Sequence, residues 1–218
     1  CMAKNPKNVY SLLQKVFNPA IARAKEELAD MQKMVDKEGG KFKIESWDWW
    51  YYAEKVRKEK YALDEEQLRP YFEVNNVRDG AFAVATKLYG LTFTKLENMP
   101  LYHPECQVFE VKDADASLIG VIYVDFFPRD SKKGGAWMNN YREQYTSADG
   151  KNVRPIVSLT LNFSKPVGDK PALLSYDEVE TFFHEFGHGL HGLLSQCTYR
   201  SIAGTNVSRD FVELPSQV

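Results

Sequence analysis

Two histidines four residues apart, His184 and His188, enclose a glutamate in the sequence His-Glu-Phe-Gly-His. On a helix, side chains at this spacing project from one face about one turn apart, so both imidazoles can reach one metal ion. Glu185 lies one residue round from His184, where its carboxylate can hold and deprotonate an attacking water. The pattern therefore predicts a helix that carries part of a zinc hydrolase site.

The flanking sequence favours a helix over a chance match. Ser175 followed three residues later by Glu178 is a capping-box pattern, which opens helices. Apolar residues then recur at helical spacing through the motif. They are Val179, Phe182, Phe183, Phe186, Leu190, Leu193 and Leu194. The sequence thus places both histidines inside one amphipathic helix.

A third metal ligand must come from outside this helix. A structural zinc site usually has four protein ligands that include cysteines, whereas a hydrolase uses three and keeps one position open. Cys197 is the only thiol nearby. The metzincin arrangement needs glycine at 191 and histidine at 194, where this chain has His191 and Leu194, so that class is excluded. Glu213 follows His188 with room for a turn and a return helix, and it would complete an open three-ligand set.

Several stretches of the chain resemble the thimet oligopeptidase family of zinc metallopeptidases. The core of the resemblance is FFHEFGHGLHGLL at 182–194 and RDFVELPSQ at 209–217. It extends upstream through SWDWWYYAEKVRKEKYALDEEQLRPYFEVNNV at 46–77, YGLTF at 89–93, YHPECQVFEV at 102–111 and DFFPRDSKKGGAWMNN at 125–140. Within the family, the chain is most similar to the bacterial peptidyl-dipeptidases, which remove dipeptides from peptide C-termini.

The resemblance implies a set of roles for individual residues. His184, His188 and Glu213 would bind one zinc ion, and Glu185 would be the catalytic general base. No further cofactor is implied. Short peptides would be the substrates, with C-terminal dipeptides released. Two alternatives remain open: an endo-acting oligopeptidase of the same family, and a non-catalytic module that zinc only stabilises.

Members of that family are several times longer than 218 residues, and the resemblance places both ends of this chain inside their sequence. The tyrosine and histidine residues that grip the substrate in the family would lie beyond Val218. We therefore expect a fragment of a catalytic region, whose partners include the remainder of the parent polypeptide. The fragment alone is expected to be inactive.

Charge and cysteine content bound the other functions. The chain has 28 basic and 30 acidic residues, a formal charge of −2, which argues against nucleic acid or an anionic membrane as a partner. No apolar run approaches the roughly 20 residues that a membrane-spanning helix needs. Cys1, Cys106 and Cys197 are widely spaced and odd in number, which favours a reducing compartment over a disulfide framework. We expect a cytoplasmic location.

The local patterns predict a mainly helical α+β fold with a small antiparallel sheet, as in a zincin-like fragment. One helix is expected over 9–17, and a second starts with Asn18 as N-cap and Pro19 in its first turn and ends at Gly39. Further helices are expected over 48–61, 64–72 and 74–88, and Gly90 should end the last of them. Strands are expected over 107–111, 118–127 and 153–162, and 130–135 as a loop. The predicted division is a helical region at 1–90, then a sheet and the zinc-binding helices at 91–218, both within one truncated catalytic domain.

Three further features have both a functional and a structural interpretation. His191 lies nearly on the face of His184 and is an alternative ligand or substrate contact. Glu180, one turn before His184, is either an acceptor that orients an imidazole or a solvated carboxylate. The aromatic cluster at 47–52 suggests base stacking, but its helical spacing fits packing better.

Overall fold

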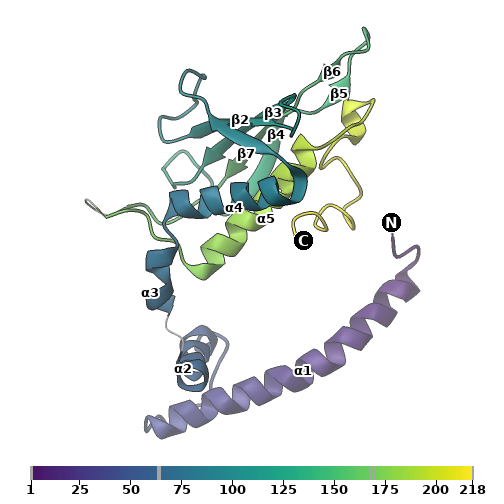
Figure 1. Ribbon diagram of the computed structural model, residues 1–218. Coiled ribbons are helices and arrows are strands. Elements are labelled where there is room, and N and C mark those ends of the chain that lie inside the picture. The colour runs from purple at the N-terminus through teal and green to yellow at the C-terminus, as the bar shows by residue number, and fades with distance from the viewer. Residues whose placement is uncertain (1, 63–64, 167, 169, 218) are drawn as a thin grey trace. The chain divides into compact units, whose positions relative to one another are not determined.

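The computed structural model describes residues 2–62, 65–166, 168 and 170–217 (Figure 1). Its contacts divide the chain into two compact units, Cys1–Gln67 and Leu68–Val218, which we call unit 1 and unit 2. The domain division at residue 90, drawn from the change of secondary-structure type, stays a prediction. Among the helices of the described residues, none is long and apolar enough to cross a membrane.

The first helix of unit 1, α1 (Pro6–Lys37), is continuous. It begins at Asn5, whose side-chain oxygen accepts from the backbone N–H of Asn8 at 3.0 Å, with Pro6 in the first turn. The predicted break at Asn18 and Pro19 is wrong, because Pro19 lies inside the helix. A proline removes one backbone hydrogen bond, and the remaining bonds of this 32-residue helix hold it together. The helix therefore starts at the pair Asn5-Pro6, thirteen residues before the predicted pair Asn18-Pro19.

Unit 1 has a small core where α2 (Trp49–Tyr61) packs on the C-terminal part of α1. Tyr52 is buried there with residues of α1. These are Met31, Met34 and Val35. Trp49 packs against the same cluster, whereas Trp47 and Trp50 are exposed. Lys55 of α2 also forms an ion pair with Glu38, which caps α1. The helix predicted at 64–72 is α3 (Glu65–Leu68) followed by a 3-10 turn (Arg69–Tyr71); residue 64 is outside the described residues.

Unit 2 is built from two long helices and a sheet (Figure 1). The long helices are α4 (Val74–Tyr89) and α5 (Tyr176–Leu193), and a short 3-10 helix spans Arg200–Ile202. The strands are β1 (Thr92–Lys95), β2 (Gln107–Lys112), β3 (Leu118–Asp125), β4 (Trp137–Arg142) and β7 (Ile156–Thr160), with a separate pair β5 (Tyr145–Thr146) and β6 (Asn152–Val153). As predicted, α4 stops at Gly90, which adopts a left-handed φ of 75°.

The main sheet is mixed, with the strand order β1-β2-β3-β7-β4. The α+β class is confirmed, but the predicted antiparallel sheet is wrong, because β7 runs parallel to β3 and antiparallel to β4. Ser158 and Thr160 alternate with apolar residues along this strand, a pattern that by itself favours a strand with one exposed face. In the structure both faces of β7 are buried, as is usual for a strand in parallel pairing.

Helix α5 is fixed at its start and along its length. Ser175 and Glu178 form the predicted capping box, with Ser175 Oγ accepting from Glu178 N at 3.1 Å and Glu178 Oε2 accepting from Ser175 N at 2.8 Å. Phe182, Phe186 and Leu193 are buried in the core of unit 2. Helices α4 and α5 lie side by side on one face of the sheet (Figure 1). The packing sets which side of α5 faces away from the sheet.

A buried ion cluster fixes the loop between β3 and β4. The carboxylate of Asp125, at the end of β3, accepts from Tyr102 at 3.1 Å and Arg129 at 3.0 Å, and pairs with Lys132 at 2.9 Å. The Lys132 ammonium also donates to the backbone oxygens of Asp125 and Phe127. The side chains of Asp125 and Lys132 are only 1% and 2% exposed. This cluster fixes the path by which the chain enters β4.

Replacing one member of the cluster should destabilise the protein strongly. We expect Lys132→Met to lower the free energy of unfolding by about 3 kcal/mol, because the buried Asp125 carboxylate loses the more deeply buried of its two cationic partners and keeps only Arg129. Urea denaturation checks this. The neighbouring Lys133→Met, at an exposed side chain, is the matched control and should change stability by less than about 0.5 kcal/mol. Equal effects of the two substitutions would contradict the role of the cluster.

The same cluster predicts a dependence of stability on pH. Burial alone would raise the pKa of Asp125, but hydrogen bonds and charge from Arg129 and Lys132 outweigh it, so this pKa lies below the ordinary 3.8. A carboxyl group whose pKa is lower in the folded than in the unfolded protein stabilises the fold at pH values above the unfolded-state pKa. This stabilisation is lost as the pH falls through the folded-state pKa. Asp125→Asn should therefore lose less stability than the unmodified protein between pH 5 and strongly acidic pH. The free energy of unfolding of both proteins is measured by urea titration at several pH values. An equal dependence on pH in the two proteins would exclude this contribution of Asp125.

Candidate metal centre

The described structure places the two histidines as the spacing predicts. Both lie on α5, with ring centroids 4.9 Å apart. His188 is 8% exposed and Glu185 6%, while the side chain of His184 is 35% exposed. The helix therefore presents one buried and one more accessible imidazole towards the same space.

Glu213 reaches this space from a segment of consecutive turns. Val212 N donates to Ser208 O at 3.1 Å, and Leu214 N donates to Phe211 O at 2.9 Å. The return helix expected here is absent from the described residues up to 217, which form turns instead. Short turn hydrogen bonds are enough to direct one carboxylate, so a full helix is not needed to deliver the residue.

The three side chains converge on one point. Glu213 Oε2 lies 3.2 Å from Nε2 of His184 and 3.2 Å from Nε2 of His188. One potential ligand atom from each residue lies within 4.8 Å of the others. Ligand atoms about 2.0–2.2 Å from a tetrahedral zinc ion are roughly 3.3 Å apart. Two imidazole nitrogens and one carboxylate oxygen are therefore close to the spacing and donor type that zinc requires.

Burial tunes the groups around this point. It raises the pKa of Glu185, an effect that the charge of nearby Glu213 increases and that of His184 opposes. Burial also lowers the pKa of His188, so its ring is neutral at neutral pH and keeps a nitrogen lone pair for a metal ion. A buried carboxylate with a raised pKa is a stronger proton acceptor than an exposed one.

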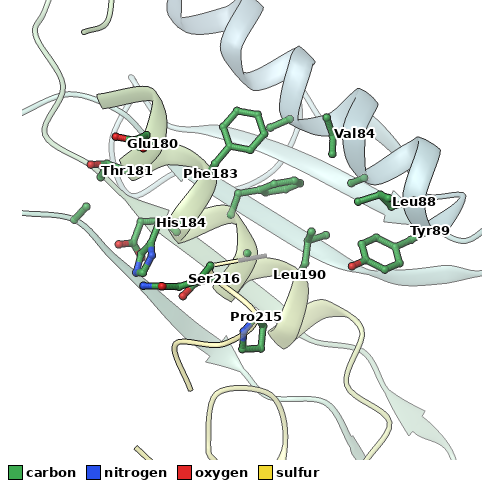
Figure 2. A pocket seen from close by; sticks show the side chains of 17 residues that line it. Val84, Leu88, Tyr89, Glu180, Thr181, Phe183, His184, Leu190, Pro215 and Ser216 are labelled. Carbon is green, nitrogen blue, oxygen red and sulfur yellow. The ribbon is translucent and has the colours of Figure 1, made fainter. Parts of the chain in front are cut away.

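Two depressions meet at His184 and Glu185. The smaller, of about 320 Å³, is lined by Glu213, His188 and Ala136–Met138, where the chain enters β4. The larger, of about 780 Å³, is a mainly apolar groove between α4 and α5. Figure 2 shows Leu88 of α4 on one side of this groove and Phe183 of α5 on the other. The groups that can react therefore lie open to a cleft.

The alternative residues are placed differently. His191 packs against Phe211, with ring centroids 6.3 Å apart. Among the described residues, it is not part of the group of converging ligand atoms. Glu180 lines the groove, and no hydrogen bond joins it to His184 in the described part of the chain. Its orienting role therefore finds no support in these contacts.

Two parts of the site's surroundings were not predicted from the sequence. Ala136–Met138 follow the predicted loop at 130–135 and were assigned no element, although they line the smaller pocket. No role was predicted for Ser216, which is buried and contacts Glu213. The position of Ser216 three residues after a candidate ligand was the available signal. No sequence pattern indicated that β4 would lie beside α5.

Comparison with known proteins identifies relatives along the whole chain. This chain is 47% identical over 218 residues to a dipeptidyl carboxypeptidase of Salmonella typhimurium and 45% identical to that of Escherichia coli. It is also 40% identical over 217 residues to oligopeptidase A of Escherichia coli. In each case nearly all of this chain matches, but it spans only 32% of the relative's length.

A comparison with protein-family models agrees with these relatives. The profile of peptidase family M3 matches residues 1–218. The resemblance to oligopeptidases and peptidyl-dipeptidases found in the sequence is thereby confirmed. The chain belongs to peptidase family M3.

Proposed function

We propose that this chain carries the metal-binding and proton-transferring part of a zinc-dependent peptidase. The observation that carries the proposal is the position of Glu213 Oε2, 3.2 Å from both imidazole nitrogens. His184, His188 and Glu213 would hold one zinc ion and leave a coordination position open. Membership of a peptidase family supports hydrolysis of peptide bonds as the reaction.

Glu185 has the properties of the general base in this reaction. A zinc ion, when bound, supplies Lewis-acid chemistry that makes water acidic near neutral pH and polarises a carbonyl. The carboxylate of Glu185 lines the same pocket as the three ligands. It would accept a proton from the attacking water and pass it to the departing amine. Its burial favours the first step by raising its affinity for the proton.

Strand β4 is the element best placed to bind an extended peptide. In the main sheet of the described residues it is an edge strand, with β7 on one side only. Its first residues, Trp137 and Met138, line the pocket beside Glu185. An edge strand can bind a peptide through main-chain hydrogen bonds, which are independent of the peptide's sequence. This arrangement fits substrates that are short and varied.

The favoured reaction is release of dipeptides from the C-termini of short peptides. It rests on similarity to proteins named dipeptidyl carboxypeptidase. Internal cleavage is the alternative, supported by the similarity to oligopeptidase A. Mass analysis of products decides between them: stepwise loss of two C-terminal residues marks the first, and internal fragments mark the second. The test belongs in a polypeptide extended to the length of these relatives.

The ligand assignment predicts the effect of removing an imidazole. His188→Ala should weaken zinc binding by more than about 100-fold, since a lost ligand has a larger effect than a lost outer-shell partner. Equilibrium dialysis of the 218-residue chain measures this. His103→Ala is the matched control, because His103 does not line the pocket. Similar zinc affinities for the two variants would contradict the assignment.

The role of Glu185 predicts a separation of binding from catalysis. Glu185→Gln should leave zinc affinity nearly unchanged, yet lower peptide hydrolysis by about 100-fold or more, because the amide cannot accept the proton. Zinc affinity is measured in the 218-residue chain, and peptide hydrolysis is measured in the extended polypeptide. Asp177→Asn, on an exposed position of the same helix, is the control. Retention of more than about a tenth of the extended polypeptide's activity would refute the role.

A further inference from the structure

Glu213 lies on an irregular segment, so something other than regular secondary structure must hold its carboxylate in place. Its side chain is 58% exposed, although the two imidazoles that it faces are on a packed helix. An exposed glutamate on a run of turns has several rotamers available, and fixing one of them costs conformational entropy. The neighbours of this segment therefore bear directly on metal affinity.

Ser216 makes the first of two contacts that restrain Glu213. Its hydroxyl oxygen lies 2.8 Å from the backbone oxygen of Glu213 and 3.2 Å from Oε2 of the same residue. That Oε2 is the atom that faces both His184 and His188. Ser216 is 9% exposed, so water competes poorly for its hydroxyl. The hydroxyl can thus hold the turn closed or donate to the carboxylate.

Gly187 makes the second contact, from helix α5. A Cβ built on this residue would lie 2.7 Å from the backbone oxygen of Pro215 and 2.7 Å from Cα of Ser216. Both are backbone atoms, which cannot swing aside as the end of a side chain can. Because Gly187 has no side chain, the turn at Pro215 and Ser216 lies directly on the helix. Gly187 itself lies between Glu185 and His188 in the sequence. Figure 2 shows Pro215 and Ser216 beside α5 near His184.

We infer that Gly187 and Ser216 together form a seat that positions Glu213 as the third metal ligand. Gly187 sets the distance between the turn and the helix, and Ser216 sets the direction of the carboxylate. Both are positioning residues, because they act through Glu213. The inference rests on the proposed function, since it assumes that Glu213 binds the metal ion.

Gly187→Ala separates a positioning role from a general effect on folding. Alanine has a higher helix propensity than glycine, so the substitution should leave the helix content intact. At the same time it should lower the zinc affinity of the 218-residue chain by about tenfold or more, because the turn must move away. Gly80→Ala in α4 is the matched control, since a Cβ there meets nothing within 4 Å. It should leave zinc affinity unchanged.

Two results would overturn the role of Gly187. One is an unchanged zinc affinity in Gly187→Ala. The other is an equal loss of affinity in Gly80→Ala, which would show that the effect comes from helix propensity. Circular dichroism and thermal denaturation of the metal-free proteins accompany each titration. A variant that has lost helix content is replaced by Gly187→Ser, which tests the same steric contact.

Ser216 is tested by removal and restoration of its hydroxyl. Ser216→Ala should weaken zinc binding by about tenfold, as for other groups that orient a ligand. Ser216→Thr keeps the hydroxyl and should restore most of the affinity. Full affinity in the alanine variant would overturn the inference for this residue, and so would equal losses in both variants.

A double-mutant cycle distinguishes failure of this inference from failure of the proposed function. In a Glu213→Ala background, Gly187→Ala and Ser216→Ala should cause no further loss of zinc affinity, because the group that they position is gone. If Glu213→Ala itself leaves zinc affinity unchanged, the proposed ligand set is wrong. If Glu213→Ala weakens binding but the other two do not, only the seat is wrong.

Discussion

The packing of α5 against the sheet is the constraint on which the rest of unit 2 depends. Phe182 and Phe186 are buried on one side of this helix, and burial of such side chains contributes about 1.5–3 kcal/mol each. Because the helix cannot rotate without exposing them, the direction of His184 and His188 is fixed as well. A hydrophobic core that has no chemical role thus sets the geometry of the candidate metal ligands.

The buried cluster at Asp125 positions the other wall of the smaller pocket, as the packing of α5 positions the histidines. Edge strands have hydrogen-bond partners on one side only, and β4 depends on the loop before it for its position. Lys132 ties that loop to Asp125 at the end of β3, and Asn162 donates to the backbone oxygens of Lys133 and Gly135 at 2.8 and 2.7 Å. The loop predicted at 130–135 is therefore held on both sides. This restraint fixes the position of β4 beside the smaller pocket.

Local sequence signals predicted the elements that depend on local interactions. The capping box at Ser175 and the glycine stop at Gly90 are both present, because each needs only a few neighbouring residues. The break at Pro19 and the antiparallel sheet were wrong for the opposite reason. A proline is tolerated when the flanking turns hold the helix, and the direction of strand pairing depends on which strand lies beside β7.

The sequence by itself determined the chemistry that is available. The spacing of His184 and His188 on a capped helix, and the presence of Glu213 further on, follow from residue order and helix geometry. Only the tertiary structure decided that Glu213 reaches both rings, and that Ala136–Met138 form the opposite wall. These depend on contacts between segments far apart in the chain, such as Gly187 with Pro215. Periodicity within one segment carries no information about such contacts.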